Sequence, residues 1–291
     1  MFGIPIQAIS GQLLLGLING AFYALLSIGL AIIFGLLHVV NFAHGAQYAL
    51  GAFAAYFLLH MAGIPYWGAL LAAPIIVGIL GIVFERCFLR RLYEVDNVYQ
   101  LLLTYSLALM IEGTLRALYG SSGLPYNNPI PGGVNLGFMF LPYYRGWVVV
   151  LSLTVCLATW LIIEKTKLGS YLRAATEKPD LVRTFGVNVP VMVTLTYGWG
   201  VAMAGLAGVL AAPIYQVSPG MGTNLLIIVF AVVVIGGMGS LLGAVIAGFG
   251  LGLLEGVTKL IYPSASTTVI FAAMILVLLI KPNGLFGREM T

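Results

Sequence analysis

The sequence has very little charge. Only 8% of its 291 residues are Asp, Glu, Lys or Arg, whereas a soluble domain carries about 25%. A chain so poor in charge cannot cover a globular surface with polar groups, and 61% of its residues are hydrophobic. The scarcity of charge therefore excludes a water-soluble globular domain and predicts an integral membrane protein that is solvated by lipid.

Charge is absent altogether from two long stretches. No Asp, Glu, Lys or Arg occurs from Met1 to Phe84 or from Thr184 to Leu254, and each stretch is long enough for about three spans of roughly 20 residues. The first stretch also lacks a basic n-region, and its apolar pattern continues far beyond the core of a signal peptide. We therefore expect a set of membrane spans there and no cleaved leader.

The apolar segments predict an all-α, polytopic integral membrane protein with about eight, and at most nine, transmembrane helices. The expected spans are residues 10–37, 43–61, 65–85, 97–118, 146–163, 190–213, 223–237, 240–258 and 266–281. No loop is large enough to fold as a soluble unit. We expect a single transmembrane domain over residues 1–291.

Residues that could carry enzymatic or metal chemistry are also scarce. The two cysteines and three histidines have no metal-ligand spacing and predict no disulfide and no metal site. None of the five lysines follows a glycine, so there is no phosphate-binding loop, and Gly-x-Ser-x-Gly and His-Glu-x-x-His are missing too. The sequence predicts no catalytic residue and no bound cofactor, so any ATP must be hydrolysed by a partner.

The few basic residues lie in short loops, which is typical of membrane topology rather than of nucleic-acid binding. Basic side chains gather in residues 86–96, in residues 164–189 and after Ile280, and we expect these three segments to face the cytoplasm. The loop 119–145 is rich in Pro, Gly and Asn and contains only Arg145. We expect it to face the periplasm.

Glycine is abundant, with 37 residues, and part of it is spaced for helix packing. Three small-xxx-small pairs are present, namely Gly16 with Gly20, Gly239 with Gly243, and Gly248 with Gly252. Such pairs let two helix backbones approach closely in a bilayer. They favour tight packing inside the chain, and they leave open that some of these faces meet a second subunit.

Two segments interrupt the helical pattern, one at Asn41–Gly45 followed by Gln47 and the other at Gly236–Ser240. Irregular backbone at membrane depth is tolerated only where it is buried in protein or lines a cavity, and broken helices near the midplane mark substrate sites in many transporters. We therefore expect Gly-broken helices near the midplane. The candidate residues of a translocation pathway are Asn41, His44, Gln47, Gly236, Gly237, Met238, Gly239 and Ser240.

The three polar residues of the first break have an alternative interpretation. Asn41, His44 and Gln47 are spaced at i, i+3 and i+6, so on a helix they fall within an arc of about 120°. Polar side chains within a membrane usually have a function. They either line a pathway or form hydrogen bonds with backbone groups that the break sets free, and the sequence does not decide between the two.

Two acid–base pairs have helical spacing within spans. Glu112 precedes Arg116, and Glu255 precedes Lys259, both at i, i+4, which is the favourable order for an ion pair. Locally satisfied pairs are the favoured interpretation of both. No other carboxylate is expected deep in a span, which argues against a proton relay.

The loop 164–189 contains five of the 13 basic residues and is amphipathic. Its apolar residues recur at helical spacing, and they are Leu168, Tyr171, Leu172 and Ala175, then Leu181 and Phe185. Gly169 and Pro179 interrupt the loop, and Gly186 ends its second helical piece. We expect two short helices across the inner face of the membrane, bound either to anionic lipid or to a soluble protein.

Four segments of the sequence resemble one known family. They are Asn41–Gly45, the stretch from Gly169 through Pro179 to Asn188, the break Gly236–Ser240, and the tail Lys281–Gly287. In this order, and over nearly the whole chain, they are similar to permease subunits of branched-chain amino acid ABC transporters, the LivH-type proteins of the bacterial inner membrane. The resemblance implies a multi-pass permease subunit that is not itself an enzyme.

The resemblance also implies partners. Such permeases work in pairs, commonly as a heterodimer with a sister permease. Two cytoplasmic ABC ATPase subunits bind ATP and Mg for them, and a periplasmic binding protein delivers the substrate. In the family, the segment that matches Gly169–Gly186 is the coupling loop that docks on the ATPase. Its residues here are Gly169, Arg173, Ala174, Glu177, Pro179, Phe185 and Gly186.

The expected function is therefore import of branched-chain or related hydrophobic amino acids, energised by separate ATPase subunits. Relatives in the same family also handle urea, amides and aromatic or other carboxylates, so a different substrate is an alternative. An ion-coupled secondary transporter or channel is a further alternative, and it would need a coupling-ion site that the spans do not offer. A membrane scaffold or enzyme is the third, and the missing catalytic motifs argue against it.

Overall fold

The computed structural model describes residues 5–287, with the side chains of Thr176 and Glu177 left out. Within this range the chain forms eleven α-helices, two short 3₁₀ helices and one β-hairpin. The helices are α1 (Ile6–Leu37), α2 (His44–His60), α3 (Tyr66–Cys87), η1 (Leu89–Leu92), α4 (Asn97–Tyr119), α5 (Tyr143–Lys165), α6 (Lys167–Glu177), α7 (Pro179–Thr184), α8 (Val189–Tyr215), α9 (Thr223–Gly236), α10 (Leu241–Ile261), η2 (Pro263–Ala265) and α11 (Thr268–Ile280). The hairpin pairs β1 (Gly133–Asn135) with β2 (Phe140–Pro142), antiparallel.

All nine segments expected to cross the membrane are helical, but they differ in length. Six helices are long and apolar enough to span a bilayer, namely α1, α3, α4, α5, α8 and α10. The others are shorter: α2 has 17 residues, α9 has 14 and α11 has 13. At 1.5 Å per residue, α9 and α11 reach only about 20 Å, against a hydrocarbon core of about 30 Å. The structure confirms a polytopic helical protein and does not confirm eight or nine full spans.

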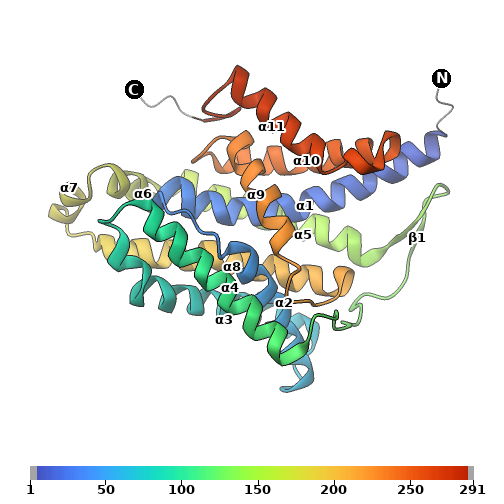
Figure 1. The fold of residues 1–291 in the computed structure, drawn as a ribbon, viewed down its shortest axis with the longest axis horizontal. Helices are drawn as coiled ribbons and strands as arrows, with labels where there is room; N and C mark the ends of the chain where they lie inside the picture. The colour runs from blue at the N-terminus through green and yellow to red at the C-terminus, as the bar shows by residue number, and fades with distance from the viewer. Residues whose placement is uncertain (1–4, 288–291) are drawn as a thin grey trace.

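The two ends of the bundle are chemically different (Figure 1). One end, which we call the basic end, carries η1, α6 and α7, at the left of Figure 1. The opposite end, which we call the hairpin end, carries β1 and β2, at the right. The loops that the charge pattern placed on opposite sides of a membrane thus lie at opposite ends of the molecule, as the topology requires.

Helices α1 and α8 form the centre of the bundle. The most apolar 18-residue windows of these helices are 83% and 78% buried, whereas that of α4 is only 11% buried. The outer helices α3 and α4 leave large apolar side chains exposed, such as Leu71, Ile79 and Leu109. Such a surface is stable only against lipid or another protein subunit, so the helices sort into a buried centre and an apolar outer rim.

The small-xxx-small pairs pack inside the chain. Gly16 and Gly20 on α1 lie against Gly248 and Gly252 on α10, so closely that a Cβ at any of the four would meet the backbone of the opposite helix. Two helix backbones can approach this far only where side chains are missing.

The third pair is also enclosed. A Cβ at Gly243 would meet the backbone of Gly236, and Gly239 lies against Gly35 near the end of α1. Packing within the chain is therefore confirmed for these glycines, and the alternative that their faces meet a second subunit is wrong for them.

The first break brings the chain back along α1. Helix α1 ends at Leu37 and is capped by His38 in the left-handed conformation, at φ 56°. The chain then reverses, and the His44 ring at the start of α2 contacts the carbonyl oxygen of Leu26 at 3.0 Å. Because Leu26 lies eleven residues before the end of α1, α2 begins about 17 Å into the bundle. This break is deep, as expected for a discontinuous helix.

The second break is not deep, which corrects the expectation that both breaks lie near the midplane. Gly237 and Gly239 have φ values of 101° and 90°, which a residue with a Cβ adopts only under strain. Gly239 packs near the end of α1, and the tail closes over the break, because the backbone N–H of Leu285 donates to the carbonyl of Ile235 at 2.8 Å. The break therefore lies at the basic end.

Two alanine substitutions on α10 test the glycine contact. Gly252→Ala forces a methyl group into the backbone of α1 and should lower the free energy of unfolding by about 1–3 kcal/mol. Gly250→Ala, two residues away and facing open space in the described structure, should instead raise it by about 0.5–1 kcal/mol, because alanine favours a helix over glycine. Unfolding in mixed micelles measures both, and equal effects of the two variants would contradict the packing described here.

Candidate functional site

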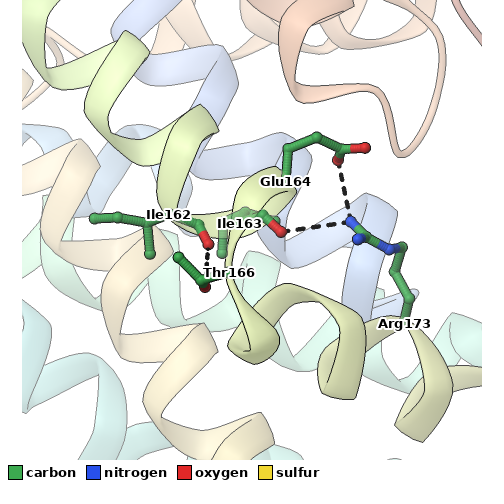
Figure 2. Close-up of polar contacts among 5 residues, drawn as sticks. All are labelled: Ile162, Ile163, Glu164, Thr166 and Arg173. Atoms are coloured by element: carbon green, nitrogen blue, oxygen red, sulfur yellow. Dashed lines mark hydrogen bonds and ion pairs between the residues drawn. The ribbon is translucent and has the colours of Figure 1, made fainter.

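The coupling loop predicted from the sequence forms α6 and α7 at the basic end, and α6 is fixed directly to the end of α5. Figure 2 shows the side chain of Arg173 reaching from α6 back to α5. Its guanidinium lies 3.1 Å from a carboxylate oxygen of Glu164 and 3.5 Å from the carbonyl oxygen of Ile163. The last carbonyl groups of a helix lack partners within it, so Arg173 caps α5 while it positions α6.

Glycine makes this close contact possible. Gly169 is buried, and a Cβ at this position would collide with the carbonyl group of Ile163. At the turn itself, the hydroxyl of Thr166 donates to the carbonyl of Ile162, which also terminates α5 (Figure 2). Gly169 and Arg173, two residues of the predicted coupling segment, therefore set the angle and the distance of α6 relative to α5.

The remaining predicted residues of the segment lie on α6 and around α7. Pro179 is the first residue of α7, where a missing N–H costs nothing. Gly186 follows the helix with φ 79°, the left-handed conformation that favours glycine. Ala174 and Phe185 are exposed, and the side chain of Glu177 lies outside the described residues.

The apolar residues of the segment divide between two faces. Leu172, Ala175 and Val182 are buried, the last two in a cluster with Val189 at the start of α8. The other four face outward at the basic end, with exposed fractions from 47% to 78%. We call these four the docking patch, and its residues are Leu168, Tyr171, Leu181 and Phe185. The sequence predicted an amphipathic segment but did not predict which apolar residues would stay exposed.

A cavity of about 300 Å³ lies behind the two short helices. Leu172, Ala175 and Pro179 form one wall, and His38 and Tyr93 contribute polar groups from the ends of α1 and η1. The cavity lies between the predicted coupling segment and the end of the central helix α1.

The polar residues of the first break bond to one another and to the break. All three are buried, and the amide Nδ2 of Asn41 donates to Oε1 of Gln47 at 2.9 Å. The side-chain oxygen of Asn41 accepts from the backbone N–H of Ala43 at 3.1 Å, and His44 bonds to the carbonyl of Leu26. Of these bonds, only the one from Ala43 satisfies a backbone group of the break itself, because Leu26 lies within α1 and the Asn41–Gln47 bond joins two side chains. The role of the three polar residues in a pathway stays a prediction.

Thr104 of α4 provides further hydrogen bonds to the backbone of the first break, and it was not among the residues predicted from the sequence. The hydroxyl of Thr104 donates to the carbonyl of Val40 at 3.1 Å, while the backbone N–H of Phe42 donates to that hydroxyl at 3.2 Å. A lone threonine in an apolar helix has no signal that separates it from an ordinary helical threonine. Its partner is 62 residues away in the sequence, and only the fold brings the two together.

The predicted residues of the second break lie elsewhere. The side chain of Ser240 caps α10 by accepting from the N–H of Gly243 at 3.1 Å, and Met238 is half exposed. Gly236 and Gly237 contact α10 and the C-terminal tail. The structure therefore places this group at the basic end and the polar group of the first break deep in the bundle.

Both predicted ion pairs are present, each at 2.6 Å: Glu112 with Arg116, and Glu255 with Lys259. The sequence analysis missed a third carboxylate, Glu85, which is fully buried at the basic end of α3.

Glu85 has no ion pair among the described residues and accepts hydrogen bonds instead. The hydroxyls of Tyr93 and Thr194 donate to its two oxygens at 2.8 and 2.6 Å. Burial and the neighbouring carboxylate raise the pKa of Tyr93 well above its ordinary value, so that hydroxyl remains a donor. The arrangement ties η1 and α8 to the end of α3.

Comparison with known proteins gives one consistent result. Residues 12–280 match the model of the family described as the permease component of branched-chain amino acid transport systems. The chain is 29% identical to the branched-chain amino acid permease BraD of Pseudomonas aeruginosa and to LivH of Escherichia coli, over 95% of each chain. It is 28% identical to a probable LivH of Methanocaldococcus jannaschii, over 91% of this chain and 88% of that one.

Substitution of Arg173 tests how α6 is held. Arg173→Gln removes the ion pair with Glu164 and should speed amide hydrogen exchange in α6 about two- to fivefold, the range of a partly exposed pair. Arg183→Gln removes the exposed pair with Asp180 on α7 and should leave exchange in α6 unchanged. Unchanged exchange in the Arg173 variant would mean that packing at Gly169 alone holds the helix.

Proposed function

The chain belongs to the family of permease components of branched-chain amino acid transport systems, and we propose that it forms part of the membrane passage of an ATP-driven importer. Its substrates are branched-chain or related hydrophobic amino acids. The observation that carries this proposal is the family match over nearly the whole chain. It favours import of these amino acids over an ion-coupled carrier and over a permease for urea, amides or other carboxylates.

The orientation follows from charge. The chain is a multi-pass membrane protein, and we place it in the bacterial inner membrane with its basic end in the cytoplasm. The arginines at the end of α3 and in η1 support this orientation, as do the basic residues of α6 and α7. The hairpin end, where Arg145 is the one basic residue of the loop 119–145, then faces the periplasm and a substrate-binding protein.

The docking patch supports contact with a cytoplasmic ATPase. Exposed apolar side chains at the end of a membrane protein that faces water usually mark an interface, and the docking patch has four of them on two short helices. Arg173 and Gly169 fix α6 to α5, so displacement of α6 would act on a full-length span. ATP and Mg bind to two ATPase subunits, and α6 and α7 of this chain transmit their movement to the membrane helices.

The passage itself requires a second permease subunit. We propose a heterodimer with a sister permease, with the first break contributing Asn41, His44 and Gln47 to the pathway wall when the bundle opens. Their burial in hydrogen bonds within one chain is compatible with a closed state. The short helices α2, α9 and α11 act as partial spans, as broken helices do in other transporters.

Reconstitution tests the proposed function directly. The chain is placed in liposomes with its sister permease, the two ATPases and the binding protein, and uptake of labelled L-leucine is followed. Uptake should require ATP inside the compartment that contacts the basic end, and it should stop when a non-hydrolysable analogue replaces ATP. Leucine uptake that persists without ATP, or that follows an imposed ion gradient with this chain alone, would contradict the proposal.

Phe185 is the sharpest probe of the docking patch because its side chain is 78% exposed. Phe185→Asp introduces a charge where an apolar contact is proposed and should weaken ATPase binding at least about tenfold, as for a residue central to an interface. Phe140→Asp, at a 59% exposed phenylalanine of the hairpin end, is the matched control and should leave binding intact. The measurement is co-purification of the ATPases from nanodiscs.

A further inference from the structure

A second cavity, of about 340 Å³, lies at the hairpin end, and no function described so far uses it. It opens between the beginnings of α1 and α5 and the ends of α8 and α10. Arg145 and Lys259 are the charged residues of its wall. Its volume is in the range of small-molecule sites.

The cavity has one uncompensated positive charge. Lys259 is neutralised by Glu255 at 2.6 Å, and the second oxygen of Glu255 accepts from the hydroxyl of Tyr23 at 2.6 Å. Arg145 lies in the first turn of α5, is partly buried, and has no ion-pair partner among the described residues. A guanidinium that lines a cavity without a counter-ion attracts an oxyanion, which it can bind through two parallel hydrogen bonds.

The rest of the cavity wall has both polar and apolar groups. The hydroxyl of Tyr215 donates to Oδ1 of Asn19 at 2.9 Å, which fixes the amide oxygen and leaves the NH₂ group of this lining residue available as a donor. Leu15, Ile18 and Ile214 supply apolar surface beside it. A ligand that matches this wall has an anionic head and an apolar group of a few carbon atoms.

We propose that this cavity binds an oxyanion attached to an apolar group, with Arg145 as the counter-ion and Asn19 as a second donor. The carboxylate of an apolar amino acid that enters from the periplasm has this chemistry. This choice of ligand rests on the proposed function, and it makes the cavity a binding site on the periplasmic side of the import route. The phosphate of a membrane lipid shares the chemistry, and the experiment separates the two sources.

Binding is measured on the full complex of this chain with its sister permease and ATPases, in phosphatidylcholine nanodiscs and without the binding protein. Labelled L-leucine is the probe, and isovalerate and leucinol are the competitors. Isovalerate keeps the carboxylate and should compete, whereas leucinol lacks it and should not. A second arm adds phosphatidylglycerol to the nanodiscs and follows the thermal stability of the complex.

Variants of Arg145 identify the site. Arg145→Gln should weaken leucine binding at least about tenfold, the effect of removing one charged hydrogen-bonding partner. Arg145→Lys keeps the charge and should lose less leucine affinity than Arg145→Gln. This difference shows that the weaker binding of the Gln variant does not come from misfolding. Arg116→Gln is the matched control, because Arg116 is an exposed arginine near the end of α4 that its pair with Glu112 already compensates, and it should bind leucine as the natural chain does.

The outcomes are distinguishable. Leucine binding that depends on Arg145 supports the amino-acid source, and stabilisation by phosphatidylglycerol that depends on Arg145 supports the lipid source. Equal leucine binding and equal lipid stabilisation in the natural chain and in Arg145→Gln would overturn the proposal. If Arg145→Gln has no effect on binding but the natural chain shows ATP-driven uptake, only the proposed binding site is refuted. If no ATP-driven uptake occurs at all, the proposed function is refuted.

Discussion

Helices in a bilayer gain little from burying apolar side chains against one another, because lipid tails are equally apolar. This constraint explains why the central helix α1 meets α10 through glycine. At Gly16, Gly20, Gly248 and Gly252, the backbones of α1 and α10 are in direct contact, so dispersion forces act over the largest possible area. A larger side chain at any of these four positions would push α1 and α10 apart, so the packing of the bundle depends on this contact.

The same solvent decides where the chain can be irregular. A backbone break deep in lipid would leave N–H and C=O groups without partners, and the first break avoids this with Asn41, Gln47 and Thr104. The backbone N–H groups of Phe42 and Ala43 thereby have side-chain partners inside the protein. The second break lies at the basic end, closed by the C-terminal tail.

The sequence was sufficient for features that depend on local pattern. The nine apolar segments, the two short helices of the basic loop and the two acid–base pairs follow from hydrophobic spacing and charge order, and all are present. What it could not supply depends on distant contacts. The burial of Glu85 against Thr194, the depth of each break and the division of the amphipathic segment into a buried face and the docking patch are set by tertiary packing.

In the proposed orientation, the two ends of this bundle face opposite compartments, with the basic end toward the ATPases. Cysteine labelling tests it in a Cys87→Ser background, since Cys156 is buried. Ser122→Cys lies in the exposed loop of the hairpin end and Ser170→Cys in the exposed part of α6. In intact cells whose outer membrane admits the reagent, a membrane-impermeant maleimide should label position 122, and position 170 only after the inner membrane is opened. Labelling of position 170 in intact cells, with position 122 protected, would contradict the account.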